Sequence, residues 1–94
     1  MIEIAYEEKE RRSAAYDGEK CVGECDYDEN GAVWTAYHTE VDPAYGGQGI
    51  AGRLVSALAE AARVRGAKIM PTCSYVVRLF DTKPEYAALD ARKA

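Results

Sequence analysis

The sequence predicts an α+β fold, an open α/β sandwich, and three observations lead to this class. The first half of the chain alternates apolar and polar residues and contains two dipeptides typical of tight hairpins, Asp17-Gly18 and Asn30-Gly31. After Pro43 the apolar period changes from two residues to the helical 3.6. A short strand follows that helix, and a helical crossover normally joins parallel strands, so the sheet should be mixed.

Three strands of an antiparallel meander are expected in the first half. Residues 13–16 and 20–27 flank the first turn, and residues 32–41, rich in aromatic and β-branched side chains, follow the second. Proline cannot donate to a strand ladder, so Asp42-Pro43 should end the meander. Residues 1–6 are expected to add an edge segment.

The three cysteines, Cys21, Cys25 and Cys73, are expected to be free thiols, because their number is odd and no export signal precedes them. Alternation within residues 20–27 predicts that Cys21 and Cys25 face the same side of the sheet. A zinc site would need two more ligands, and His38 is the only histidine. We therefore expect no metal site.

An amphipathic helix is predicted from Ile50 to Ala62, where apolar residues recur at helical spacing. The cationic Arg63 and Arg65 suit its last turn, and Gly66 is a favourable residue after a helix end.

Three shorter elements complete the predicted order β-β-β-α-β-α. Lys68 to Pro71 form a short strand. Ser74 is expected to cap a second helix over residues 75–81, and Pro84, at a first helical position, begins a turn or short helix.

The length bounds the organisation of the chain. Ninety-four residues suffice for one domain, so residues 1–94 are expected to form a single unit. No apolar run approaches the roughly 20 residues of a membrane helix, and the N-terminus lacks the basic start and apolar core of a signal peptide. These features predict a cytoplasmic protein without a membrane partner.

The net charge of −4 is distributed unevenly. Residues 1–45 hold 4 Lys and Arg against 12 Asp and Glu, whereas residues 46–94 hold 8 against 4. The positive half suits a small polyanion, although a solvated helix surface would have the same composition. The acidic half would repel a nucleic-acid backbone, so we expect no nucleic-acid partner.

Glycines gather at positions 46, 47, 49 and 52, between the last strand of the meander and the long helix. The first amides of a helix lack partners, the helix dipole is positive there, and glycine lets an anion approach the backbone. Four glycines in seven residues exceed the needs of a tight turn. The segment therefore predicts a phosphate-binding loop formed by Gly46, Gly47, Gln48, Gly49, Ile50 and Ala51.

Two other phosphate-binding patterns fit this loop poorly. Gly47-x-Gly49-x-x-Gly52 formally matches the dinucleotide fingerprint, but that fold requires an acidic residue about 20 positions later, and residues 67–71 contain none. A Walker loop is absent, because no Gly-Lys-Ser/Thr follows.

The loop and the end of the strand before it resemble the GNAT superfamily of N-acetyltransferases. That superfamily carries V-x-P followed by a Gln/Arg-x-x-Gly-x-Gly/Ala loop, and Val41, Pro43, Gly49 and Ala51 occupy matching positions. Gly46 departs from the first loop position, where Gln or Arg is usual, so a side-chain contact is lost and backbone contacts remain. The resemblance implies that the loop amides hold the pyrophosphate of acetyl-CoA.

A closer resemblance, to the very small single-domain GNAT subgroup with a Cys-Ser/Pro-Tyr motif, extends over nearly the whole chain. It implies a GNAT-like core without the helices that shape a substrate pocket in larger relatives. Its marks are His38-Thr39-x-Val41-x-Pro43, the loop, Gly66-x-Lys68-Ile69-x-Pro71-x-Cys73-Ser74-Tyr75 and Pro84-Glu85-Tyr86.

The resemblance also implies further cofactor contacts. Thr39 and Val41 would lie beside the pantetheine arm, with the Val41 amide placed to polarise the thioester carbonyl. Ser74 and Tyr75 begin the second helix, and Arg78, one turn later, is placed to reach a phosphate or to form a surface salt bridge. Tyr75, like Tyr86, is a candidate proton donor to the coenzyme thiolate, with packing of the ring as the favoured alternative.

Two residues are candidates for the chemistry itself. Cys73 precedes a helix, where a thiolate is favoured, and is the candidate nucleophile. A small buried residue beside the cofactor is the alternative, with direct attack of the amine on the thioester. His38 is the candidate general base, or else a partly buried structural histidine.

These inferences predict an acetyl-CoA-dependent N-acyltransferase that acetylates a primary amine of an unidentified small-molecule, peptide or protein acceptor. The alternative is a CoA-binding or interaction module without turnover.

Overall fold

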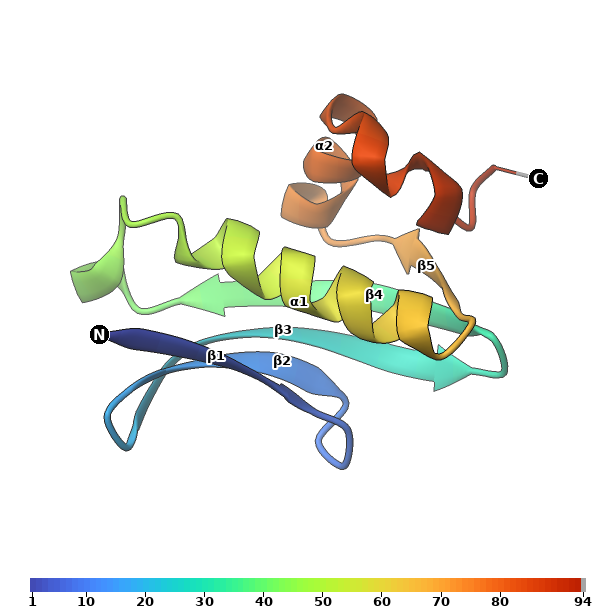
Figure 1. Ribbon diagram of the computed structural model, residues 1–94. Helices are drawn as coiled ribbons and strands as arrows, with labels where there is room; N and C mark the ends of the chain where they lie inside the picture. The colour runs from blue at the N-terminus through green and yellow to red at the C-terminus, as the bar shows by residue number, and fades with distance from the viewer. Residues whose placement is uncertain (94) are drawn as a thin grey trace.

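The computed structural model describes residues 1–93, which form a five-stranded sheet with helices on one face (Figure 1). The long helix α1 lies across the sheet, and α2 packs beside it near β4 and β5. No helix within residues 1–93 is long and apolar enough to cross a membrane. The elements in order are β1 (Ile2–Glu7), β2 (Arg12–Asp17), β3 (Lys20–Asn30), β4 (Val33–Val41), η1 (Pro43–Tyr45), α1 (Ile50–Val64), β5 (Lys68–Pro71), α2 (Ser74–Thr82) and η2 (Pro84–Leu89).

The sheet is mixed, as predicted. Strands β1 to β4 pair antiparallel in sequence order, and β5 pairs parallel with β4. The last β4–β5 pair is Ala36 with Pro71. Residues 37–41 of β4 therefore extend past the end of β5, and we call this side of the strand the free edge.

Most predicted elements are confirmed, and the differences lie at their ends. Helix α1 starts at Ile50 as expected and continues to Val64, and Gly66, with φ of 72°, follows its end. Ser74 is not the cap of α2: Cys73 occupies the N-cap, and Ser74 is the first helical residue. The cap prediction is wrong because Cys73 already has the extended backbone of a cap residue, so the helix begins one residue earlier.

The prediction that Cys21 and Cys25 share a face is also wrong. The β2–β3 register changes so that Ala15 pairs with Gly23 and the next β2 residue pairs with Cys21. The extra residue in β3 is Val22, a bulge that reverses the alternation beyond it. Cys21 is therefore exposed, whereas Val22 and Cys25 are buried.

The core lies between the sheet and α1. Leu54 and Leu58 of α1 are fully buried, which stabilises the fold by about 1.5–3 kcal/mol for each side chain. On the sheet side, the rings of Tyr27 and Trp34 stack 4.2 Å apart. Ser13 is also buried, and its hydroxyl donates to the Leu54 carbonyl at 2.7 Å, which ties β2 to the middle of α1.

Residues 90–92 are fixed to the sheet. The amide of Ala91 donates to the Ile69 carbonyl, and Asp90 forms an isolated bridge with the same strand. The Asp90 carboxylate is buried and accepts from the Arg92 guanidinium, which also contacts Asp81 of α2. This ion pair holds α2 and the last residues against β5.

Candidate functional site

The free edge of β4 is one side of the candidate site. The amides of Thr72 and Cys73 both donate to the Ala36 carbonyl, at 3.1 and 3.0 Å, and the chain then leaves the sheet to begin α2. Further along β4, the Asp42 amide donates to Val22 of β3 at 2.8 Å. Alternate residues of a strand direct their amides to opposite edges, so the Val41 amide points to the free edge.

The glycine-rich loop lies at the end of this edge. Its first part is the short helix η1, where the Asp42 carboxylate accepts from the Ala44 amide at 2.9 Å. The Tyr45 hydroxyl donates to Asp17 at 2.6 Å and fastens η1 to the first hairpin. These contacts fix where the loop starts.

The loop then leads into α1, whose first residues have no side-chain cap. Gly47 and Gly49 have φ of 77° and 74°, a left-handed conformation that favours glycine. Gly49 is the N-cap, and the first helical bond runs from the Arg53 amide to its carbonyl. The amides of residues 50–52 thus have no helical partner, and no side chain within residues 1–93 caps them.

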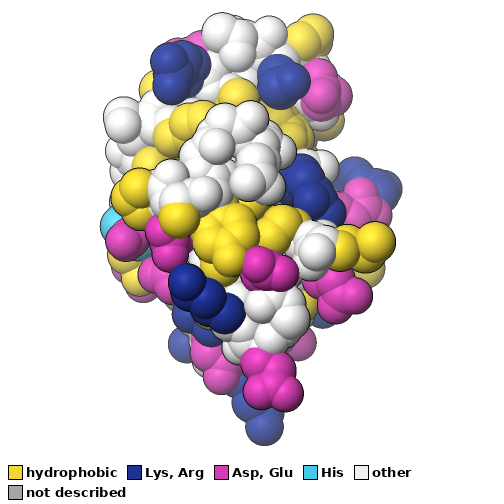
Figure 2. Space-filling model, turned by 90° about the vertical axis from the view of Figure 1, so that its left-hand side faces the viewer, with side chains coloured by type: hydrophobic (Ala, Val, Ile, Leu, Met, Phe, Trp, Pro, Cys, Tyr) yellow, Lys and Arg dark blue, Asp and Glu magenta, His cyan; other side chains and the backbone are white. Residues whose placement is uncertain are grey.

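Figure 2 faces the end of the molecule that carries this loop. White backbone and uncharged atoms occupy the middle of the face, and acidic side chains lie mostly in its lower half, on the side of the strands. The loop itself, residues 46–49, carries no charged side chain and is exposed. An anion can therefore approach the helix start without meeting a carboxylate of the loop.

Helix α2 forms the second side of the site. A Cβ atom on Gly52 would lie 3.5 Å from the Tyr75 hydroxyl, so Tyr75 lies against the first turn of α1. The Arg78 guanidinium lies 5.9 Å from the centre of the Tyr75 ring. Ser74 and Arg78 are exposed, whereas Tyr86 is buried and stacks on Phe80, a packing role for that ring.

Cys73 lies where α2 meets the free edge. Its Sγ is 3.5 Å from the Thr39 hydroxyl oxygen. Burial raises the pKa of the Cys73 thiol, but hydrogen bonding with the Thr39 side chain and with the amides of Val76, Tyr75 and Thr39 outweighs this effect. The net result is a pKa below the ordinary thiol value, the direction expected of a cysteine at a helix start.

A second thiol lies behind the site. The Thr39 hydroxyl also contacts the Sγ of Cys25 at 3.5 Å. Cys25 is completely buried, and burial raises its pKa to about 11, so it stays protonated at neutral pH. No role for Cys25 could be predicted from the sequence, because the bulge in β3 hides its position facing Thr39.

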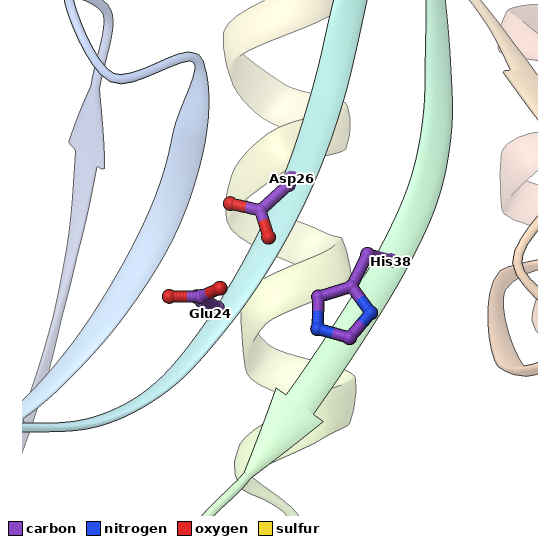
Figure 3. A group of neighbouring side chains, drawn as sticks. All are labelled: Glu24, Asp26 and His38. Carbon is purple, nitrogen blue, oxygen red and sulfur yellow. The ribbon is translucent and has the colours of Figure 1, made fainter.

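His38 lies on the opposite face of the sheet from α1 and is not brought together with Cys73. Figure 3 shows it pointing toward Glu24 and Asp26. One carboxylate oxygen of each acid and one imidazole nitrogen all lie within 4.8 Å of one another. The His38 Nε2 also lies 3.1 Å from a Glu40 oxygen. Burial, reinforced by a hydrogen bond and repulsion from Glu24, raises the pKa of Asp26 to about 6.

This group arises from the pairing of β3 with β4, which places Asp26 opposite His38 and Glu24 opposite Glu40. The spacing of the residues along the chain does not reveal it. Histidine and carboxylates are metal-ligating types, but charged side chains are also usual on a sheet face that water covers. We therefore assign no metal to the cluster.

A pocket of about 380 Å³ lies where the end of β4 meets the start of β3. It has the volume of a small-ligand site, and three of its residues are acidic. No continuous motif predicts this pocket, because its lining joins two segments that are far apart in the sequence. Its lining residues are Cys21, Val22, Gly23, Glu24, Glu40, Asp42 and Pro43.

Comparison with known proteins identifies the group to which this arrangement is similar. A family model described as GCN5-related N-acetyl-transferase matches residues 11–89. A search of curated proteins gives no match. Among solved structures, a GCN5-like protein from Staphylococcus aureus is 27% identical, with a TM-score of 0.75 over 94% of this chain and 86% of that one.

Two larger acetyltransferases share the fold. The ribosomal-protein-S18-alanine N-acetyltransferase of Escherichia coli is 18% identical, with a TM-score of 0.66 over 80% of this chain and 53% of that one. An acetyltransferase of Trypanosoma brucei is 17% identical, with a TM-score of 0.61 over 82% and 63% of the two chains. The chain thus spans about half of the Escherichia coli enzyme.

Proposed function

Since the chain belongs to the family of GCN5-related N-acetyl-transferases, we propose that it transfers an acetyl group from acetyl-CoA to a primary amine. The observation that carries this proposal is the meeting of three groups along the free edge of β4. These are the unpartnered amides at the start of α1, the Val41 amide and the Cys73 thiol.

The loop and helix start fit a pyrophosphate. Amides of residues 50–52 lack helical partners, and the dipole of α1 makes this end positive. No side chain stands in the way, because Gly46, Gly47 and Gly49 are exposed and have none. Gln48 and Arg78 are exposed nearby candidates for side-chain contacts with phosphate oxygens.

The free edge fits the arm that carries the acetyl group. In this proposal acetyl-CoA is a substrate that supplies the acetyl group as a thioester. Thr39 and Val41 line the edge, and the Val41 amide donates to the carbonyl oxygen of the thioester as charge develops there. Ser74 and Tyr75 close the opposite side, at the start of α2.

Two routes for the acetyl group fit this arrangement. In the direct route the acceptor nitrogen attacks the thioester carbonyl, the CoA sulfur leaves, and the nitrogen gives up a proton. In the covalent route the Cys73 sulfur attacks first, the CoA sulfur leaves, and the acceptor nitrogen then takes the acetyl group from Cys73. The lowered pKa of Cys73 supports its candidacy as nucleophile.

The acceptor would approach from the side of the acidic pocket. Glu40 lines that pocket and contacts His38 across the sheet from α1, so in this proposal the proton of the amine passes to water or, through water, to His38. The acidic side chains of the pocket, Glu24, Glu40 and Asp42, are exposed or partly exposed. We therefore propose an acceptor bound on an open surface, either a peptide, a protein or a small amine.

The test is a screen with labelled acetyl-CoA against a panel of amines and peptides. Turnover that disappears in Gly49→Asp supports the proposal. Acetyl-CoA binding without turnover on any acceptor would favour the alternative, a CoA-binding module. Absence of binding would remove both.

Intact-protein mass spectrometry separates the two routes. The covalent route requires an acetyl group on Cys73 before any amine is added, and Cys73→Ala should then bind acetyl-CoA but lose transfer. Cys21→Ala, which removes an exposed thiol, is the control for the mass measurement and should leave the acetyl adduct on Cys73 unchanged. A Cys73→Ala variant that acetylates amines at the original rate would leave the direct route.

A further inference from the structure

Thr39 lies between two thiols. Its hydroxyl oxygen is 3.5 Å from the Sγ of Cys73 on one side and 3.5 Å from the Sγ of Cys25 on the other. Cys73 is partly exposed at the candidate site, whereas Cys25 is completely buried in the core. The three side chains thus connect the site to the interior through hydrogen bonds.

We propose that Thr39 and Cys25 are positioning residues for Cys73, forming a hydrogen-bond chain whose direction reverses when Cys73 loses its proton. In the structure the Cys73 thiol donates to the Thr39 hydroxyl oxygen, and the Thr39 hydroxyl donates to Cys25. A thiolate cannot donate, so after deprotonation the hydroxyl turns and donates to Cys73. The Cys25 thiol then donates to the Thr39 oxygen.

The chemistry of the three groups permits this reversal. A hydroxyl has one proton to donate and two lone pairs to accept, so it can serve either neighbour but not both at once. Cys25 must keep its proton to act as the donor, and burial, which raises its pKa to about 11, ensures that it does. A hydrogen bond to a charged sulfur is stronger than one between neutral groups, so the reversed chain favours the thiolate.

The rest of the surroundings fixes the chain in place. Thr39 pairs with Cys25 across β3 and β4, and its branched side chain has a restricted χ1 angle. From α2, the Tyr75 and Val76 amides face the Cys73 sulfur, and the Thr39 amide faces it from β4. Two negative charges act on Cys25 of β3, that of the ionised Cys73 and that of Asp26. Both favour the neutral Cys25 thiol.

The experiment measures the protonation of Cys73 directly. The rate of alkylation by iodoacetamide is followed against pH in a Cys21→Ala background, so that the exposed thiol does not contribute. Thr39→Val keeps the shape and removes the hydroxyl, and should raise the Cys73 pKa by about one unit, a tenfold loss of thiolate at neutral pH. Thr39→Ser restores the hydroxyl and should restore the original profile.

The second arm tests Cys25. Cys25→Ala removes the donor behind Thr39 and should raise the Cys73 pKa by a smaller amount, whereas Cys25→Ser keeps a donor and should not raise it. An unchanged profile in Thr39→Val would overturn the proposal, and an unchanged profile in Cys25→Ala would overturn the part assigned to Cys25. Thermal unfolding of each variant checks that it is folded.

The inference rests on the proposed function only in one respect, that the Cys73 thiolate would attack the thioester. Alkylation requires neither acetyl-CoA nor an acceptor, so the two proposals can fail separately. If no variant acetylates an amine but the pH profiles shift as expected, the hydrogen-bond chain stands and the proposed activity does not.

Discussion

At Gly49 a single residue carries two requirements of the site. Its φ of 74° is a left-handed conformation, and as the N-cap of α1 it must leave the helix amides open. Gly18 in the first hairpin has a similar φ of 63°, and a Cβ at either position would meet nothing within 4 Å. Both glycines therefore need a left-handed backbone, but only Gly49 lies at the start of α1.

We expect Gly49→Asp to lower the affinity for acetyl-CoA at least tenfold, because a carboxylate would stand where the pyrophosphate is held. Gly18→Asp imposes the same backbone strain and should bind acetyl-CoA normally. Isothermal titration measures both affinities. Equal affinities in the two folded variants would contradict the assignment of the loop.

The raised pKa of Asp26 makes the stability of the protein depend on pH. The native pKa of this carboxyl is about 6, above the unfolded value near 3.8, because of burial and the neighbouring Glu24. The native state therefore binds more protons between these values, and the contribution of Asp26 to stability falls as the pH rises through this window. Asp26→Asn removes the charge and keeps a donor toward Glu24.

We expect Asp26→Asn to stabilise the protein at pH 7.5 by on the order of 1 kcal/mol, a value reduced because water screens this partly exposed group. The difference should vanish near pH 4. Asp28→Asn, exposed further along the same strand, should change little at either pH. Urea unfolding at the two pH values is the measurement, and an Asp26→Asn variant less stable than the original at pH 7.5 would contradict the expectation.

At the scale of elements, the packing of α1 on the sheet depends on one glycine. A Cβ on Gly23 would lie 3.1 Å from the Glu40 carbonyl oxygen, 3.2 Å from Leu54 and 3.3 Å from Val41. The Glu40 atom belongs to the backbone, so the strands would have to move apart. Gly52 in α1 is the opposite case, because its nearest contact, the Tyr75 hydroxyl, lies at an ordinary 3.5 Å.

We therefore expect two glycine-to-alanine changes of opposite sign. Gly23→Ala should destabilise the fold by about 1–3 kcal/mol through overpacking and, by displacing Val41, should also weaken acetyl-CoA binding. Gly52→Ala should stabilise the fold by roughly 0.5–1 kcal/mol, because alanine favours a helix. Each kcal/mol corresponds to a shift of about 4–8 °C in the melting temperature, and shifts of the same sign would refute this account.

The elements also show which parts of the fold follow from local sequence. The turns at Asp17-Gly18 and Asn30-Gly31 determine the meander, and both are confirmed because the glycines at 18 and 31 adopt the positive φ that such turns need. The bulge at Val22 could not be predicted in this way. Strict alternation assumes a constant register, and the shift is set by how β3 pairs with β2.

For the candidate site, residues close together in the sequence were predictable and cross-strand groups were not. The glycine loop and the start of α2 form continuous segments with recognisable chemistry, and the structure brings both to the free edge of β4. The Cys25–Thr39–Cys73 chain and the grouping of His38 with Glu24 join residues far apart in the sequence. The pairing of β3 with β4 determines the contacts of Cys25 and His38, and the attachment of the start of α2 to β4 determines that of Cys73. Composition contains no information on either.

The whole molecule shows a division of charge. The acidic strands carry the pocket and the face on which His38 lies, whereas residues 46–94, which include α1 and α2, hold 8 of the 12 Lys and Arg residues. A polyanion would therefore be favoured near the helices and an ammonium group near the strands. The free edge of β4 lies between these two regions, where an acetyl group would pass from one ligand to the other.

A ligand that binds only the folded state raises the stability of the whole domain. If the loop and the free edge hold acetyl-CoA, a hundredfold excess over its dissociation constant should stabilise the protein by about 2.7 kcal/mol, a rise of roughly 10–20 °C in melting temperature. NAD and ATP at the same concentration offer phosphates but no pantetheine arm for the free edge, so they should raise it much less. Gly49→Asp should abolish the rise, and Gly18→Asp should retain it. An equal rise with NAD would mean that Gly47, Gly49 and Gly52 act as a dinucleotide fingerprint after all, and the assignment of the free edge would have to be abandoned.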